Sequence, residues 1–249
     1  MVLLMVYNYK EGKIRIENIL DNRLEIIEKN YVPSENDFTF DNAYKVWISA
    51  IFVDIRNSTD LFTNENKSVV AKIIKSFTSE IIEILRDDNF CEEIGIRGDC
   101  VYAVYSTPSQ KRTYDIVRKT FWINTLFSML NKLFKERNYP TITAGIGIST
   151  DEELVIKAGR KGVGINSKVW IGNAVTKASK LSSFANKGNI NSIAFSSCTY
   201  NNTIEKLCSD NASAKSWFKQ AFHEKLGIYY HSYITITDFS DWIDEGMLE

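Results

Sequence analysis

The spacing of hydrophobic positions changes several times along the chain. Residues 46–55, V-W-I-S-A-I-F-V-D-I, form a nearly continuous apolar run, which is typical of a strand covered on both faces. Apolar residues then recur at helical spacing over 69–85 and again over 116–134. Between these helices, residues 91–105 contain two short apolar segments around Gly98-Asp99, which predicts a hairpin. Residues 141–149 predict a further strand.

The order of these elements predicts the fold. Strand, helix, strand, strand, helix, strand is the order of a ferredoxin-like βαββαβ unit, an antiparallel sheet with helices on one face. The last hundred residues add a glycine-rich hairpin around 157–164, a helix over about 173–184, a short strand at 192–196 and a late hairpin around 226–236. We therefore expect an α+β fold with extra strands, its antiparallel sheet flanked by helices.

The N-terminal part differs from the rest of the chain. Residues 1–45 are polar and irregular apart from a possible amphipathic helix over 14–27. We predict that they form an extension packed on a main domain of residues 46–249.

Composition and charge exclude several classes of protein. Thirty basic and thirty-one acidic residues leave a net charge of −1, so a dedicated nucleic-acid binder is not expected. No apolar run approaches the roughly 20 residues of a membrane span. The first ten residues lack a basic leader and a cleavage site, and the four cysteines show no C-x-x-C spacing. These features predict a cytoplasmic, thiol-containing protein that binds neither nucleic acid nor membrane.

Two aspartates stand at topologically adjacent points. In a βαββαβ unit the third strand lies antiparallel beside the first, so Asp54 at the end of the first should meet Asp99 at the start of the third. Two carboxylates about 4 Å apart repel by roughly 1 to 4 kcal/mol, and a divalent cation relieves that repulsion. Mg²⁺ prefers one or two carboxylates, with water and phosphates as its other ligands. The alternative is that Asp54 caps a helix and Asp99 is only a turn residue.

The residues that follow Asp54 lead into a helix. Free backbone N–H groups at the start of a helix bind phosphate. We therefore predict that Asn57, Ser58 and Thr59 bind the substrate's phosphates beside the metal.

Five segments together resemble the class III adenylyl and guanylyl cyclases, over about residues 47–236. Each is a weak signal alone, but their order is specific. They are F-V-D-I-R-N-S-T at 52–59, G-D-C-V-Y-A at 98–103, K-A-G at 157–159, W-I-G-N-A-V-T-K-A-S-K at 170–180 and I-A-F-S-S-C-T-Y at 193–200.

The resemblance implies a catalytic domain in residues 46–249 that closes a nucleoside triphosphate into a cyclic monophosphate. In that family, positions matching Asp54, Asp99 and the backbone carbonyl of Ile55 bind two divalent cations, Mg²⁺ or Mn²⁺. The cations polarise the triphosphate and help the ribose 3′-hydroxyl attack the α-phosphorus, so that pyrophosphate leaves. The family's active sites are composite and lie at the interface of a head-to-tail homodimer.

The sequence departs from the purine-specific enzymes at four positions. Their base-reading residues are replaced by Gly95 and Val169, which offer no polar side chain to a purine. Their transition-state asparagine and arginine are replaced by Thr176 and Lys180, which keep one charge but lose the bidentate fork. These substitutions resemble the pyrimidine cyclases of bacterial Pycsar anti-phage systems. Those enzymes make cyclic UMP or cyclic CMP, and an effector responds to the cyclic nucleotide rather than to direct contact.

Two further basic residues are candidates for substrate binding. Arg97 is expected to contact a base carbonyl or the phosphates, and Lys225 resembles the family's triphosphate-binding lysine. The alternatives are an exposed hairpin arginine and a solvated surface lysine. Lys180 has the same alternative, on a solvated helix face.

Several hypotheses about function remain open. A pyrimidine cyclase, with UTP favoured over CTP, accounts for the retained aspartates and the missing purine readers. A purine cyclase that reads its base through backbone groups is the second. A degenerate domain that only binds nucleotide or a partner is the third, suggested by Thr176 and Lys180. An RNA-binding module is the weakest, because no aromatic RNP motif lies on the strands.

Overall fold

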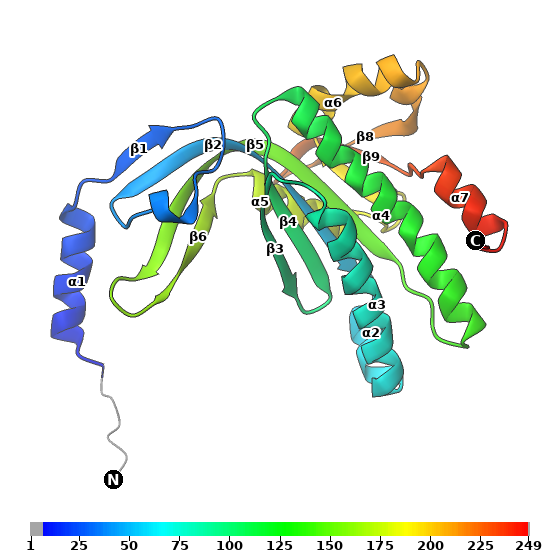
Figure 1. Ribbon diagram of the computed structural model, residues 1–249, viewed down its shortest axis with the longest axis horizontal. Coiled ribbons are helices and arrows are strands. Elements are labelled where there is room, and N and C mark those ends of the chain that lie inside the picture. The colour runs from blue at the N-terminus through cyan, green and yellow to red at the C-terminus, as the bar shows by residue number, and fades with distance from the viewer. Residues whose placement is uncertain (1–6, 249) are drawn as a thin grey trace, which may run out of the picture.

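One sheet with helices on both faces organises the chain in the computed structural model, which describes residues 7–248 (Figure 1). The strands hydrogen-bond in the order β3-β4-β2-β5-β7-β9-β8, with β1 paired to β2 and β6 to β5. The strands are β1 (Glu25–Glu28), β2 (Asn42–Ile55), β3 (Cys91–Arg97), β4 (Cys100–Ser106), β5 (Ala144–Arg160), β6 (Ile165–Ile171), β7 (Ile193–Ser196), β8 (Phe218–His223) and β9 (Gly227–Ser232). The helices are α1 (Tyr9–Asp21), α2 (Ser58–Asn64), α3 (Lys67–Arg86), α4 (Gln110–Glu136), α5 (Ala174–Phe184), α6 (Ser197–Asp210) and α7 (Thr237–Asp244), with short 3-10 helices η1 (Glu35–Asp37) and η2 (Ala214–Trp217).

The predicted βαββαβ unit is confirmed. It consists of β2, α3, β3, β4, α4 and β5, and its strand order β3-β4-β2-β5 is that of a ferredoxin-like unit. Both neighbours of β2 in this unit, β4 and β5, run antiparallel to it. The sheet is nevertheless mixed, because β7 runs parallel to β5 and β1 runs parallel to β2.

The continuous apolar run of β2 serves two cores. Ile51, Val53 and Ile55 join the cluster that contains α3 and α4, while Ala50 and Phe52 join a second cluster that includes residues of α5. Side chains alternate between faces along a strand, so a strand covered on both faces must be apolar at every position. The two helices of the βαββαβ unit, α3 and α4, share one face as expected, and α5, which lies outside that unit, covers the other face.

Glycines allow α5 to pack directly on β5. A Cβ atom on Gly147 would lie 2.1 Å from the carbonyl oxygen of Ala178, and one on Gly145 would lie 1.9 Å from a guanidinium nitrogen of Arg56. Both distances are shorter than any real contact, so neither position has room for a side chain. The close approach fixes α5 against the end of the sheet that carries Asp54.

The N-terminal part contains a helix and a strand where one helix was predicted. α1 ends at Asp21, and residues 25–28 instead pair with β2. β2 begins at Asn42 and so crosses the predicted boundary at residue 45. The division into residues 1–45 and 46–249 remains a prediction. Residues 1–6, on which the expectation of no leader peptide partly rests, lie outside the described residues.

Three helices and one boundary differ from the sequence prediction. α2, α6 and α7 were not predicted, and the late hairpin spans Phe218–Ser232 rather than residues 226–236. α6 follows β7 without a loop because the Ser196 side chain accepts a hydrogen bond from the Thr199 N–H and caps the helix. Among the described residues, no helix has the length and apolarity needed to cross a bilayer.

Candidate active site

The structure brings Asp54, Ile55 and Asp99 together at one end of the sheet. Asp54 pairs with Cys100 in the β2–β4 register, and the Ile55 N–H donates a hydrogen bond of 3.3 Å to the Asp99 carbonyl oxygen. The proximity of the two aspartates, expected from topology, is therefore present in the fold.

Arg56 supplies a counter-charge that the sequence prediction did not assign. One guanidinium nitrogen donates to Asp54 Oδ2 at 3.1 Å, Nε donates to the Ala185 carbonyl at 3.1 Å, and the other terminal nitrogen donates to the Ser182 carbonyl. The Arg56 side chain is 7% exposed and that of Asp54 is 28% exposed. Arg56 thus joins the Asp54 carboxylate to the C-terminal end of α5.

Burial outweighs the effect of Arg56 on the Asp54 carboxyl. Burial raises the pKa of Asp54 and the charge of Asp99 raises it further, whereas Arg56 and Lys187 act in the opposite direction. A raised pKa means that the ionised carboxylate is disfavoured, and an added cation reverses that balance. The two carboxylates therefore fit a divalent cation.

Such a cation would need further ligands from outside these side chains. Within residues 7–248 no group of three or more His, Cys, Asp or Glu side chains is arranged to hold a metal ion. Backbone carbonyls, water and substrate phosphates would have to complete its coordination, as is usual for Mg²⁺.

The predicted phosphate-binding residues adjoin the aspartates. Asn57 adopts a left-handed conformation with φ 55°, which asparagine tolerates better than most residues, and α2 begins immediately after it. Ser58 and Thr59 form the first turn of α2. Their N–H groups belong to the set that a helix leaves unsatisfied at its start, so this segment can still bind an anion.

α5 and the β8–β9 hairpin carry three further basic or polar candidates, Thr176, Lys180 and Lys225. Thr176 and Lys180 are exposed and lie on one face of α5, four residues apart. Lys225 is exposed in the β8–β9 turn, and that hairpin packs on α5, where the rings of Phe184 and His223 lie 4.5 Å apart. Lys225 therefore lies in a hairpin that contacts α5, the helix that carries Thr176 and Lys180, and the C-terminal end of that helix contacts the Arg56 side chain.

Arg97 lines a cavity of about 550 Å³ between β3, β4 and β6. Val169 lines the same cavity, and Gly95 lies beneath the Tyr102 ring, which a Cβ atom on Gly95 would approach to 2.4 Å. The Arg97 guanidinium lies 5.6 Å from the centre of that ring. Of the two positions expected to read purines, Val169 lines this cavity and Gly95 lies beside it under the Tyr102 ring, and neither has a polar side chain.

Sequence reasoning missed the polar side chains of this cavity. Glu93 accepts hydrogen bonds from the Tyr102 hydroxyl at 2.6 Å and from Trp170 Nε1 at 2.7 Å. The available signal was the two-residue period of β3, which places Glu93, Gly95 and Arg97 on one face of the strand. Only Arg97 was selected from that set.

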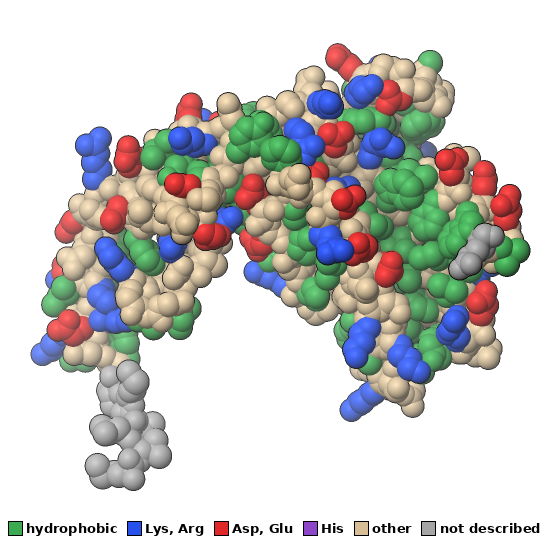
Figure 2. All heavy atoms as spheres, viewed as in Figure 1, with side chains coloured by type: hydrophobic (Ala, Val, Ile, Leu, Met, Phe, Trp, Pro, Cys, Tyr) green, Lys and Arg blue, Asp and Glu red, His purple; other side chains and the backbone are tan. Residues whose placement is uncertain are grey.

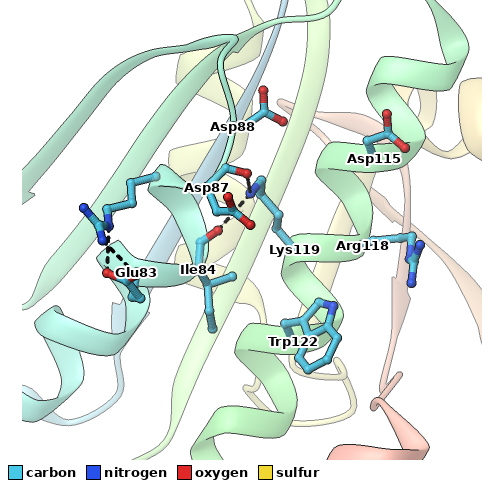
Figure 3. A pocket seen from close by; sticks show the side chains of 9 residues that line it. Glu83, Ile84, Asp87, Asp88, Asp115, Arg118, Lys119 and Trp122 are labelled. Carbon is cyan, nitrogen blue, oxygen red and sulfur yellow. Dashed lines mark hydrogen bonds and ion pairs between the residues drawn. The ribbon is translucent and has the colours of Figure 1, made fainter.

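A larger cavity, of about 840 Å³, lies between the end of α3 and the middle of α4 (Figure 3). Its lining includes Lys119, which donates to the carbonyls of Ile84 at 2.9 Å and Asp87 at 3.0 Å. Burial lowers the pKa of Lys119. These bonds cap the C-terminal end of α3, and none of the predicted site residues lines the cavity.

Glu153 is a buried acid at the start of α5 that sequence reasoning also missed. Its side chain is 1% exposed, one oxygen accepts a hydrogen bond from the Ala174 N–H, and the other has no partner among residues 7–248. Burial raises its pKa to about 7, while Lys177 lowers it and Asp151 raises it. The folded state therefore favours the protonated, uncharged form of the Glu153 carboxyl.

Glu153→Gln is expected to flatten the dependence of stability on pH. Because the folded pKa of about 7 exceeds the ordinary 4.5, the stabilisation by the acid is complete below pH 4.5 and is lost as pH rises through 7. At 1.36 kcal/mol per pKa unit, the native protein should lose roughly 3 kcal/mol over this range. Urea unfolding at pH 5 and pH 8 measures the difference, and an equally steep decline in the variant would contradict it.

Comparison with known proteins identifies the family. The model of the adenylate and guanylate cyclase catalytic domain matches residues 42–216, more than half of the chain. The chain belongs to this family. It is therefore a nucleotidyl cyclase, and its expected resemblance to class III cyclases is confirmed.

Similar proteins include both sequence relatives and solved structures. The chain is 47% identical to a uridylate cyclase of Treponema porcinum, over 99% of this chain and 84% of that protein. It is 27% identical to a uridylate cyclase of Gulbenkiania mobilis, over 96% and 97% of the two chains. Its fold matches the adenylyl cyclase CyaB from P. aeruginosa with a TM-score of 0.62 and 17% identity, over 79% of this chain and 98% of that one.

Membership in the cyclase family gives the site its general chemistry. The cyclase binds a nucleoside triphosphate, and class III cyclases generally use divalent metal ions.

Proposed function

We propose that the protein is a uridylate cyclase that converts UTP to 3′,5′-cyclic UMP and pyrophosphate. The observation that carries the proposal is the 47% identity, over 99% of the chain, to a protein named uridylate cyclase. The cavity beside Gly95 and Val169 supports it, because it lacks the side chains with which related cyclases read purines. CTP is the second candidate substrate.

Asp54, Asp99 and the carbonyl of Ile55 hold two divalent cations, Mg²⁺ or Mn²⁺, in this proposal. When bound, the cations polarise the triphosphate and lower the cost of charge that develops at the α-phosphorus. The first turn of α2, from Asn57 to Thr59, binds the phosphates. The raised pKa of Asp54 and the adjacency of Asp99 support this assignment.

The active enzyme is a homodimer with composite sites. Asp54 and Asp99 of one protomer serve the site to which the other protomer contributes Thr176, Lys180, Lys225 and the cavity that Arg97 lines. Membership in the cyclase family, for which the sequence resemblance implies composite sites, supports this arrangement. Figure 2 shows a hollow between the part that carries α1 and the β5–β6 hairpin and the part that carries α2 and α3, which leaves space for a second protomer. 

The proposed setting is cytoplasmic and antiviral. The cyclic nucleotide acts as a second messenger in defence against phage, and a downstream effector responds to it without direct contact with the cyclase. The resemblance of the sequence to the pyrimidine cyclases of Pycsar systems motivates this setting.

Incubation of the purified protein with UTP, CTP, ATP and GTP, each with Mg²⁺ or Mn²⁺, tests the proposal. Mass spectrometry should find cyclic UMP as the main product. A main product of cyclic AMP or cyclic GMP would replace the proposal with a purine cyclase. No cyclic product from any nucleotide would favour the degenerate domain.

A further inference from the structure

The cavity beside Gly95 and Val169 has polar side chains in its lining, although Gly95 and Val169 themselves have no polar side chain that could bind a base. Glu93 and Arg97 lie on the same face of β3, four residues and about 13 Å apart along the strand. Both side chains line the cavity, and both reach the ring of Tyr102 between them. A carboxylate and a guanidinium therefore flank one aromatic ring, which itself stacks on Phe52 with the ring centres 5.1 Å apart.

The Glu93 carboxylate is held in a fixed orientation. One oxygen accepts from the Tyr102 hydroxyl and the other accepts from the Trp170 indole, which can only donate. Burial, and then Glu93 itself, raises the pKa of Tyr102, so the phenol stays protonated and remains a donor. Each carboxylate oxygen has two lone pairs, so both keep the capacity to accept one more hydrogen bond.

A fixed acceptor of this kind requires a hydrogen-bond donor on the bound base. Uracil has one donor on its pairing edge, N3–H, between two carbonyls that accept. Cytosine has an acceptor at N3, which a carboxylate repels, so its only donor on this edge is the exocyclic N4 amino group, displaced from the position of N3–H. Arg97 offers donors alone, which suit a uracil carbonyl.

We propose that Glu93 is a specificity-determining residue that accepts a hydrogen bond from N3–H of uracil, with Arg97 donating to an adjacent carbonyl. This inference rests on the proposed function, since it assumes that UTP is the substrate. In this proposal the base is bound by the residues two positions before and two positions after Gly95 on β3, whereas the sequence resemblance implies that purine cyclases use the Gly95 position itself.

Glu93→Gln tests the inference because it keeps the shape of the side chain but replaces one acceptor oxygen with an amide donor. The ratio of kcat/KM for UTP to kcat/KM for CTP should fall by about 10- to 100-fold, as expected when one buried partner is mismatched. A structural role would lower both values alike and leave the ratio unchanged.

Glu92→Gln is the matched control. It changes the adjacent residue, which also lines the cavity but whose carboxylate accepts from the Ser106 hydroxyl at 2.8 Å and lies 3.6 Å from Lys168 Nζ, away from the Tyr102 and Trp170 donors. The UTP to CTP ratio of this variant should stay within about twofold of the native value, so that an equal fall in both variants would overturn the inference.

Tyr102→Phe keeps the experiment decisive if Glu93→Gln is inactive on all nucleotides. It removes only the hydroxyl that orients Glu93, and the UTP to CTP ratio should fall by about threefold. A native protein that makes no cyclic UMP would contradict the proposed function itself. If the native protein makes cyclic UMP but Glu93→Gln leaves the UTP to CTP ratio unchanged, only the role of Glu93 is overturned. If Glu93→Gln is inactive, an unchanged ratio in Tyr102→Phe has the same meaning.

Discussion

Asp54→Ala is expected to lower nucleotide turnover by at least about 1,000-fold, a loss on the scale seen when charge stabilisation of a transition state is removed. Asp54 and Asp99 adjoin at the ends of β2 and β4, and loss of one carboxylate leaves the other unable to hold the cations alone. Because the Asp54 side chain is partly exposed and belongs to none of the hydrophobic clusters, the proposed dimer should persist.

Three measurements separate a metal role from a loss of fold. Steady-state turnover gives the effect on activity, light scattering gives the mass of the oligomer, and paramagnetic resonance of Mn²⁺ gives metal binding without any turnover. Asp241→Ala, at an exposed position on α7, is the control and should match the native protein in all three. Unchanged Mn²⁺ binding in Asp54→Ala would refute the assignment of Asp54 as a metal ligand.

The meeting of Asp54 and Asp99 could be predicted because it depends only on topology. Once two segments are assigned to the first and third strands of a βαββαβ unit, the end of one must adjoin the start of the other. The register of Asp54 with Cys100 agrees with that reasoning. The adjacency of Asp54 and Asp99 does not depend on loop lengths or on side-chain packing, so a wrong prediction of either would not change it.

The partners of Arg56 could not be predicted in the same way. Its two carbonyl acceptors, on Ser182 and Ala185, lie 126 and 129 residues further along the chain. That contact requires α5 to pack on the face of the sheet opposite α3 and α4. Nothing in the sequence indicated to which face α5 would pack. Gly145 and Gly147 permit this packing, but their sequence context indicates only that they belong to a strand.

The hydrogen-bond partners in the cavity that Arg97 lines also could not be predicted from the sequence. Trp170 was placed in the correct motif and Arg97 was selected as a substrate residue, but Glu93 was not selected. Glu93 becomes significant only when β6 brings Trp170 to it, across 77 residues of sequence. A strand period can place residues on one face, but it does not show which distant strand supplies their hydrogen-bond partners.

Arg56→Ala is expected to destabilise the fold by about 3 kcal/mol, the scale on which removal of one partner from a buried ion pair acts. The change leaves Asp54 without its counter-charge, and it leaves the carbonyls of Ser182 and Ala185 without their donor. Arg56→Lys should recover only part of the loss, because a lysine keeps the charge but cannot direct three planar N–H groups at three acceptors. Urea unfolding of the two variants measures both effects.

The origin of the loss can be tested with a double variant. Combined with Asp54→Ala, Arg56→Ala should cost less than the sum of the two single changes, because removal of the carboxylate also removes the charge that Arg56 balances. Arg86→Ala is the control, since Arg86 pairs with Glu83 on an exposed face of α3 and such pairs contribute less than about 1 kcal/mol. Full additivity of the Asp54 and Arg56 changes would mean that Arg56 acts only on α5. Non-additivity would measure the coupling of the candidate metal carboxylate to Arg56, whose other hydrogen bonds end on the helix that carries Thr176 and Lys180. In a dimer with composite sites, that link would connect the two active sites, because α5 of each protomer serves the site opposite its own Asp54.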